Sequence, residues 1–127
     1  MHMSDYDFFT AQLRFVASKT ETNDEAVHGM MRLLNGVADQ IDVNESFRVD
    51  AKNVRMSARA LAGVAGFLQQ HILPEVIAAK NFTGEKQVRW TIDASMSLMA
   101  TMMTHAEMTN DEQDIELTLP PPPTPSS

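Results

Sequence analysis

Residues 85–108 read EKQVRWTIDASMSLMATMMTHAEM, and this stretch carries the clearest structural signal in the chain. Apolar or small residues recur there at intervals of four and three, which places them along one side of an α-helix. They are Val88, Ile92, Ser95, Met99, Met102 and Ala106. At 1.5 Å per residue the helix spans about 36 Å. We therefore expect a partner helix of similar length, in the same chain or in a second copy.

A second periodic segment precedes it, from about Glu45 to Leu73. Its apolar residues also alternate spacings of four and three, a period that suits packing along another long helix. They are Phe47, Ala51, Val54, Ala58, Leu61, Ala65, Leu68 and Ile72. Because the middle of the segment is rich in Ala and Gly, we expect close packing there against methionines of the later helix. Leucine at Gly63 or Ala65 should then overpack the core. Pro74 should end or kink the segment.

Two shorter helices are predicted upstream, from Ser4 to about Lys19 and from about Asn23 to Ile41. Ser4 and Thr22 each stand three residues before an acidic residue, which is the pattern of a helix capping box. The first helix either covers the core or is a mobile arm that docks on a partner. Gly29 and Gly36 lie inside the second helix, where glycine is unfavourable, and the expected reason is close approach of a neighbouring helix.

Composition and charge exclude several classes of protein. The 127 residues carry a net charge of −7, which disfavours nonspecific nucleic-acid binding and binding to an anionic membrane. There is no cysteine, so disulfides and thiolate metal sites are excluded. Neither an apolar run long enough to span a membrane nor a signal-peptide pattern is present, and we expect a cytoplasmic protein.

The end of the chain differs from the rest. Residues 111–127 are acidic and then rich in proline, and the sequence predicts one helical domain over residues 1–110 followed by a disordered tail. Removing residues 120–127 should leave folding unchanged. Ile115, Leu117 and Leu119 alternate with polar residues, which is compatible with a short extended segment. No alternating run elsewhere is long enough to predict a strand.

Catalytic and metal-binding patterns are not found. His2, His28, His71 and His105 have no second ligand at helical spacing beyond Glu25 beside His28, and no glycine-rich phosphate loop is present. We expect neither an enzyme nor a cofactor, a metal ion or a small-molecule ligand.

Two clusters are more informative. Arg48, Lys52, Arg55 and Arg59 form a basic row beside the apolar stripe. The row either pairs with acidic residues of this protein or steers an acidic partner. The methionines of residues 96–108 either fill the core or form an adaptable binding groove. Candidate contact residues for a partner or a dimer are Phe47, Arg48, Lys52, Arg55, Arg59, Leu61, Leu68, Ile92, Met96, Met99, Met102 and Met103.

Residues 54–103 resemble TraM, a small helical antiactivator of quorum sensing. The similarity lies in VRMSARAL within one helix, LQQHILPE at its end, and QVRWTIDASMSLMATM after a short connection. The order of Gln87, Ile92, Asp93 and Ala94 corresponds. Size and acidity fit equally well with a second kind of antiactivator, the QslA type, which targets LasR-like receptors. The chain departs from TraM in its longer N-terminal part and its Pro-rich end.

This resemblance implies an all-α protein with two long helices that forms an antiparallel dimer. It also implies binding to a LuxR-type transcription factor, which is thereby kept from DNA. The expectation is therefore a small bundle of three to four helices that acts by protein–protein sequestration and binds no nucleic acid. The alternative is a helical adaptor or assembly protein without a regulatory target.

Overall fold

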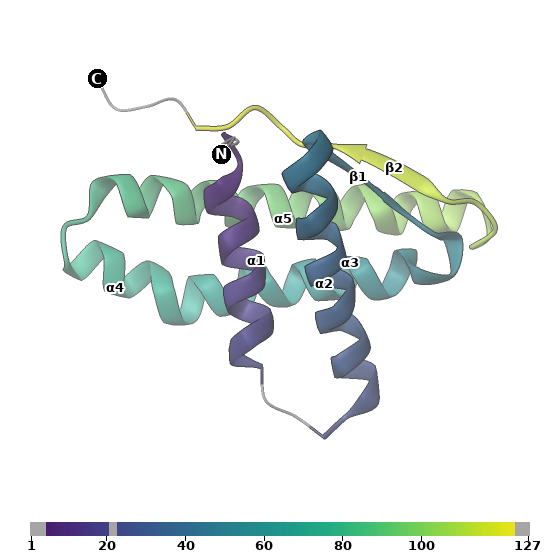
Figure 1. The fold of residues 1–127 in the computed structure, drawn as a ribbon, viewed down its shortest axis with the longest axis horizontal. Coiled ribbons are helices and arrows are strands. Elements are labelled where there is room, and N and C mark those ends of the chain that lie inside the picture. The colour runs from purple at the N-terminus through teal and green to yellow at the C-terminus, as the bar shows by residue number, and fades with distance from the viewer. Residues whose placement is uncertain (1–4, 21–22, 124–127) are drawn as a thin grey trace.

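The computed structural model describes residues 5–20 and 23–123 and is mostly helical, with a small two-stranded antiparallel sheet (Figure 1). The elements are α1 (Asp7–Lys19), α2 (Glu25–Asn44), β1 (Ser46–Val49), the 3₁₀ turn η1 (Ala51–Asn53), α3 (Val54–Phe67), the π-helical turn η2 (Leu68–Ile72), α4 (Leu73–Ala78), α5 (Phe82–Met108) and β2 (Ile115–Thr118). The prediction of a predominantly helical fold is confirmed. The small sheet adds to it, because the sequence suggested a short extended segment only at residues 115–119 and none at residues 46–49.

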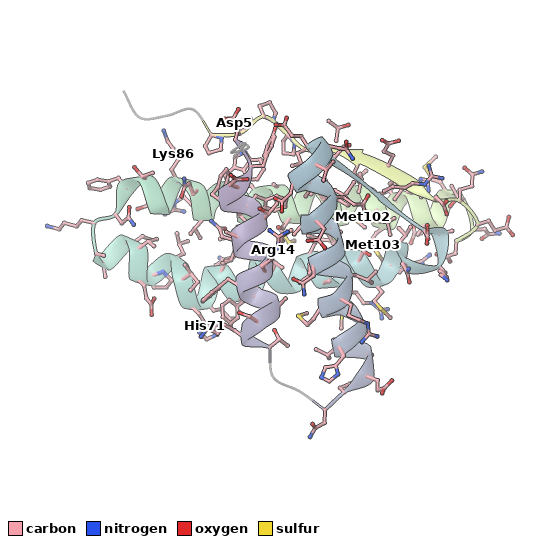
Figure 2. All side chains as sticks on the ribbon, in the orientation of Figure 1. Asp5, Arg14, His71, Lys86, Met102 and Met103 are labelled. Atoms are coloured by element: carbon pink, nitrogen blue, oxygen red, sulfur yellow. The ribbon has the colours of Figure 1, made fainter. Side chains whose placement is uncertain are left out.

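The helices form two layers. The helix running through α3, η2 and α4 lies antiparallel to α5, and α1 and α2 cross in front of this pair (Figure 1). The core between the layers includes Phe9 and Leu13 of α1 and Leu34 and Ile41 of α2, all nearly inaccessible to solvent. Arg14 joins the two front helices, because its guanidinium donates to carboxylates of Asp39 and Asp42 at 2.8 and 2.6 Å (Figure 2).

Helix α5 follows the prediction closely but begins earlier. Its N-cap is Asn81, whose side chain accepts a hydrogen bond from the Gly84 backbone N–H at 2.9 Å. The predicted stripe is largely buried, at Val88, Ser95, Met102 and Ala106, with Ile92 and Met99 half-buried. Asp24 similarly caps α2, while the predicted caps Ser4 and Thr22 lie outside the described residues.

The prediction of one helix from Glu45 to Leu73 is wrong over its first nine residues. Glu45 has a left-handed backbone (φ 56°), which ends α2, and the chain then forms β1 and η1 before α3 begins at Val54. Phe47 and Val49 alternate with exposed Arg48 and are buried, so they follow the period of a strand. The same few apolar residues fit a helical stripe, and the pairing with β2 decides between the two.

Pro74 does not end the helix but stands in the first turn of α4, where the N–H that proline lacks is not needed. The chain passes through the π-turn η2 immediately before it and continues helically to Ala78. Proline lacks an N–H and its ring crowds the carbonyl four residues earlier. A π-turn widens the helix by one residue, and such bulges are a recognised cause of local irregularity in a helix.

The C-terminal segment is folded where disorder was predicted. β2 pairs with β1, with Phe47 opposite Leu117 and Val49 opposite Ile115. Leu119 is also buried, and the hydroxyl of Tyr6 donates to the carbonyl of Pro120 at 2.8 Å. The prediction of a disordered tail is therefore wrong for this part of the chain, because three alternating apolar side chains find a buried place. Residues 124–127 lie outside the described part.

The glycines do not provide the close helix contacts that were predicted. Gly36 and Gly63 are exposed, and no atom lies within 4 Å of the place where a side chain would begin, which also holds for Gly66. A Cβ atom built on Gly29 would lie 3.5 Å from Sδ of Met56, which is an ordinary van der Waals contact. The small residues that pack closely are instead the alanines Ala58 and Ala65, which are buried.

Candidate partner-binding surface

The pair formed by α3 and α5 has a covered side and an open side. On the covered side, beneath α1 and α2, lie Ala60 and Val64 of α3 and Thr91 and Leu98 of α5, each at most about one-twentieth exposed. Aromatic side chains close the end nearest the N-terminus, where Trp90 contacts the rings of residues 6, 8 and 9. The indole N–H of Trp90 donates to the Pro121 carbonyl at 2.7 Å, which holds the C-terminal segment across this end.

The open side carries a ridge of large apolar residues on α5. We call it the methionine ridge; it consists of Ile92, Met96, Met99 and Met103. Their spacings of four, three and four place them on one side of the helix. Met96 is 42% exposed and the other three are half-buried. At one end of the ridge, Ile92 lines a pocket together with Gln69 of η2 and Leu73 of α4.

Four of the predicted contact residues belong to the interior and are unavailable to a partner of the folded chain. Phe47, Leu61, Leu68 and Met102 are each at most 2% exposed. Burial of Met102 beside the half-buried Met103 shows how the methionine set divides (Figure 2). Met102 packs into the core, as one of the two alternatives stated, whereas the methionine ridge remains accessible. The assignment of Phe47, Leu61, Leu68 and Met102 to a binding surface is therefore wrong for the folded chain.

The basic row is partly neutralised within the protein. Nη2 of Arg48 lies 2.9 Å from Asp114 and Nε of Arg55 lies 2.7 Å from Asp111, so both cations pair with the loop that follows α5. These hydrogen bonds raise the pKa of Arg48 and of Arg55. Intramolecular pairing, one of the two alternatives, is thus confirmed for Arg48 and Arg55. Lys52 and Arg59 form no salt bridge with the described part of the chain.

Asp114 also organises the start of α3. Its second carboxylate oxygen accepts a hydrogen bond from the backbone N–H of Ala51 at 2.8 Å. This backbone hydrogen bond, followed by the bond from Arg48, lowers the pKa of Asp114. The acidic loop therefore acts as a clamp between β1 and η1, although its composition alone resembles a solvated tail.

One polar pocket was missed at the sequence level. It lies between α2, β1 and the beginning of α3, and Arg32, Gly36 and Ser57 are among its lining residues. The sequence analysis interpreted Gly36 as a place of close helix approach and did not single out Arg32 or Ser57. Their proximity depends on how α2 packs on α3, which no spacing within one helix reveals.

Among the described residues no group of three or more His, Asp or Glu side chains is arranged to hold a metal ion. No helix in the described ranges combines the length and the apolar character of a membrane span. Neither a family model, nor a curated protein, nor a solved structure matches the chain.

Proposed function

We propose that this protein is an antiactivator that binds a LuxR-type transcription factor through the methionine ridge and thereby keeps it from DNA. The observation that supports this proposal is the accessible ridge itself, formed by Ile92, Met96, Met99 and Met103. Methionine side chains adapt to irregular apolar surfaces and are frequent on surfaces that receive partner helices.

The charge distribution is consistent with a protein partner. At a net charge of −7, with Arg48 and Arg55 already paired to carboxylates, little free positive charge remains to neutralise phosphates. Lys52 and Arg59 are the members of the basic row without a salt bridge in the described chain. In the proposed complex the ridge supplies the affinity, and these two cations increase the association rate with an acidic surface.

Homodimerisation is also part of this proposal. The expectation arose from two long stripes that a short chain could not cover. Leu61, Leu68 and Met102 are buried within one copy, so the fold of a single chain already covers these positions of the two stripes. A second copy would contact the methionine ridge, and we expect receptor binding to compete with this contact.

The decisive experiment is a gel-shift assay with purified LuxR-type receptors from the same genome and their DNA sites. A molar excess of this protein should remove the receptor–DNA band, whereas the protein alone should shift no DNA. Met96→Glu together with Met103→Glu places charge on the ridge and should restore the band. Intact bands for every receptor would exclude the antiactivator function.

Met108→Glu is the matched control, because Met108 is a methionine of the same helix, 81% exposed and outside the ridge. This variant should inhibit as the unaltered protein does. If Met108→Glu restores the band as fully as the ridge variant, the ridge is not the binding surface.

A helical adaptor or assembly protein is the second candidate, and the same ridge favours it. The two functions differ in what they do to transcription. An adaptor would co-purify with a complex through the ridge and leave receptor–DNA bands unchanged.

A further inference from the structure

A cluster of aromatic rings lies where the start of α1 meets the N-terminal part of α5, on the covered side of α5. We call it the aromatic cradle; it consists of Tyr6, Phe8, Phe9 and Trp90. The ring of Trp90 contacts the other three at centroid distances of 5.8, 5.2 and 5.4 Å. Tyr6 and Trp90 are the single tyrosine and the single tryptophan of the chain. Each joins a flat apolar ring to a hydrogen-bond donor, whereas phenylalanine has no donor.

The aromatic cradle holds a run of prolines from the same chain. The C-terminal segment passes the start of α1 (Figure 1), where the hydroxyl of Tyr6 donates to the carbonyl of Pro120 at 2.8 Å. The indole N–H of Trp90 donates to the next carbonyl, that of Pro121, at 2.7 Å. Both donors of the cradle rings therefore bond to successive proline carbonyls.

This arrangement matches the chemistry of a proline-rich segment. Prolines present carbonyl acceptors but no N–H donors, and consecutive prolines favour the extended polyproline II helix. A complementary surface needs flat apolar rings for the pyrrolidines and donors for the carbonyls. Protein domains that bind proline-rich partners do so in aromatic-lined grooves of this kind. The aromatic cradle supplies both parts.

The prolines are attached to the fold less firmly than the strand before them. β2 ends at Thr118, and the last fully buried apolar side chain is Leu119. Residues 120–123 are half-buried or exposed. Because proline has no N–H, these residues cannot extend the β1–β2 ladder. The proline segment can thus leave the aromatic cradle while β2 and Leu119 stay in place.

We propose that the aromatic cradle is a binding site for proline-rich segments, filled in this structure by residues 120–123 and open to a proline-rich segment of a partner protein when they leave. The chain's own prolines act as a tethered competitor, and a short flexible tether gives an effective concentration in the millimolar range. The partner segment is therefore bound weakly until the internal one is displaced. This inference goes beyond the proposed function and does not use the methionine ridge.

The test is an NMR titration of the ¹⁵N-labelled full-length protein with a blocked peptide of six prolines. Trp90 supplies the only tryptophan indole N–H of the chain, so a single cross-peak reports on the aromatic cradle. The unaltered protein should show a saturable shift of this cross-peak. A blocked peptide of alternating alanine and serine, of the same length, should cause no shift. Absence of saturation with the proline peptide, or an equal response to the control peptide, would overturn the proposal.

Loosening the internal segment should strengthen this binding. Pro120→Gly together with Pro121→Gly keeps the chain length but makes the segment flexible, so it competes less well. The affinity for the proline peptide should rise about fivefold or more. Equal affinities in this variant and in the unaltered protein would show that the peptide does not compete with residues 120–123. Because the unaltered protein must itself bind the peptide, the test does not depend on the folding of the variant.

Tyr6→Phe removes one donor and keeps the ring, and it should weaken binding of the proline peptide about threefold or more. Phe15→Leu is its matched control, because Phe15 is an aromatic residue of α1 that is 39% exposed and contacts Phe67 outside the aromatic cradle. This variant should bind the peptide as the unaltered protein does. Unchanged affinity in Tyr6→Phe, or an equal loss in Phe15→Leu, would contradict the assignment.

Discussion

Helix α5 presents two different surfaces to its surroundings. Towards α1 and α2 it buries Thr91, Leu98 and the aromatic contact at Trp90, and the C-terminal segment closes this side. On the opposite side the methionine ridge is left half-exposed. Both surfaces are apolar, so hydrophobicity alone does not distinguish them. What distinguishes them is which side other segments of the same chain can reach.

This difference separates residues that hold the fold from residues that can bind a partner. Met102 and Met103 are adjacent in sequence and identical in chemistry, but only Met102 is fully enclosed. Substitutions on the covered side should therefore change stability, and substitutions on the open side should change binding.

The largest expected effect comes from removing the C-terminal cover. A chain that ends after Asp114 loses Ile115, Leu117 and Leu119, and burial of each aliphatic side chain contributes about 1.5–3 kcal/mol. Their sum is comparable with the whole stability of a small domain, which is about 5–15 kcal/mol. We expect loss of the cooperative unfolding transition in urea, followed by circular dichroism.

A chain that ends after Leu119 is the control for this truncation. It keeps the three apolar residues and loses only the carbonyl acceptors of Tyr6 and Trp90, at about 1 kcal/mol each. Equal stability of the two truncated proteins would show that the apolar residues of β2 contribute nothing.

The adjacent methionines provide the second test. Met102→Ala should lower the free energy of unfolding by about 2–5 kcal/mol, because it leaves a cavity in the core. Met103→Ala should lower it by about 1 kcal/mol or less, as is usual for partly exposed positions. Equal losses in chemical denaturation would mean that the ridge is covered in solution, for example by a second copy.

The small residues of α3 provide a third test. Substitutions at a buried and at an exposed position should change the free energy of unfolding in opposite directions. Ala65→Leu should destabilise by about 1–3 kcal/mol through overpacking, since Ala65 is buried. Gly63→Ala should stabilise by up to about 1 kcal/mol, since the site is open and alanine favours the helix. The second result would reverse the expectation from sequence, in which Gly63 was packed.

The smallest effect concerns the clamp at Asp114. Because the Ala51 N–H and Arg48 lower the pKa of Asp114, its charged form stabilises the folded state at pH values above the ordinary carboxyl pKa of about 3.9. This contribution is lost as pH falls through the lowered pKa. Asp114→Asn should thus be less stable than the unaltered protein near neutrality, and the difference should shrink below about pH 4. A difference that stays constant down to pH 2 would show that the Asp114 charge is not involved.

Much of the helical content follows from sequence alone. The stripes of α5 and of α3 beyond Val54, and the acidic residue at the start of α2, each predicted helices that the structure contains. A helix forms its hydrogen bonds between residues four apart, so the pattern that specifies it is local. The alternation of Ile115, Leu117 and Leu119 was also compatible with an extended segment, and the structure contains β2 there.

The tertiary structure alone decided three other features. Phe47 belongs to a strand because Leu117, distant in sequence, pairs opposite it. Arg48 and Arg55 are neutralised because the loop after α5 returns to them. The methionine ridge is open because α1 and α2 cross the other side of α5 (Figure 1). Each feature depends on contacts between segments far apart in the chain, and the spacing of residues within one segment carries no information about them.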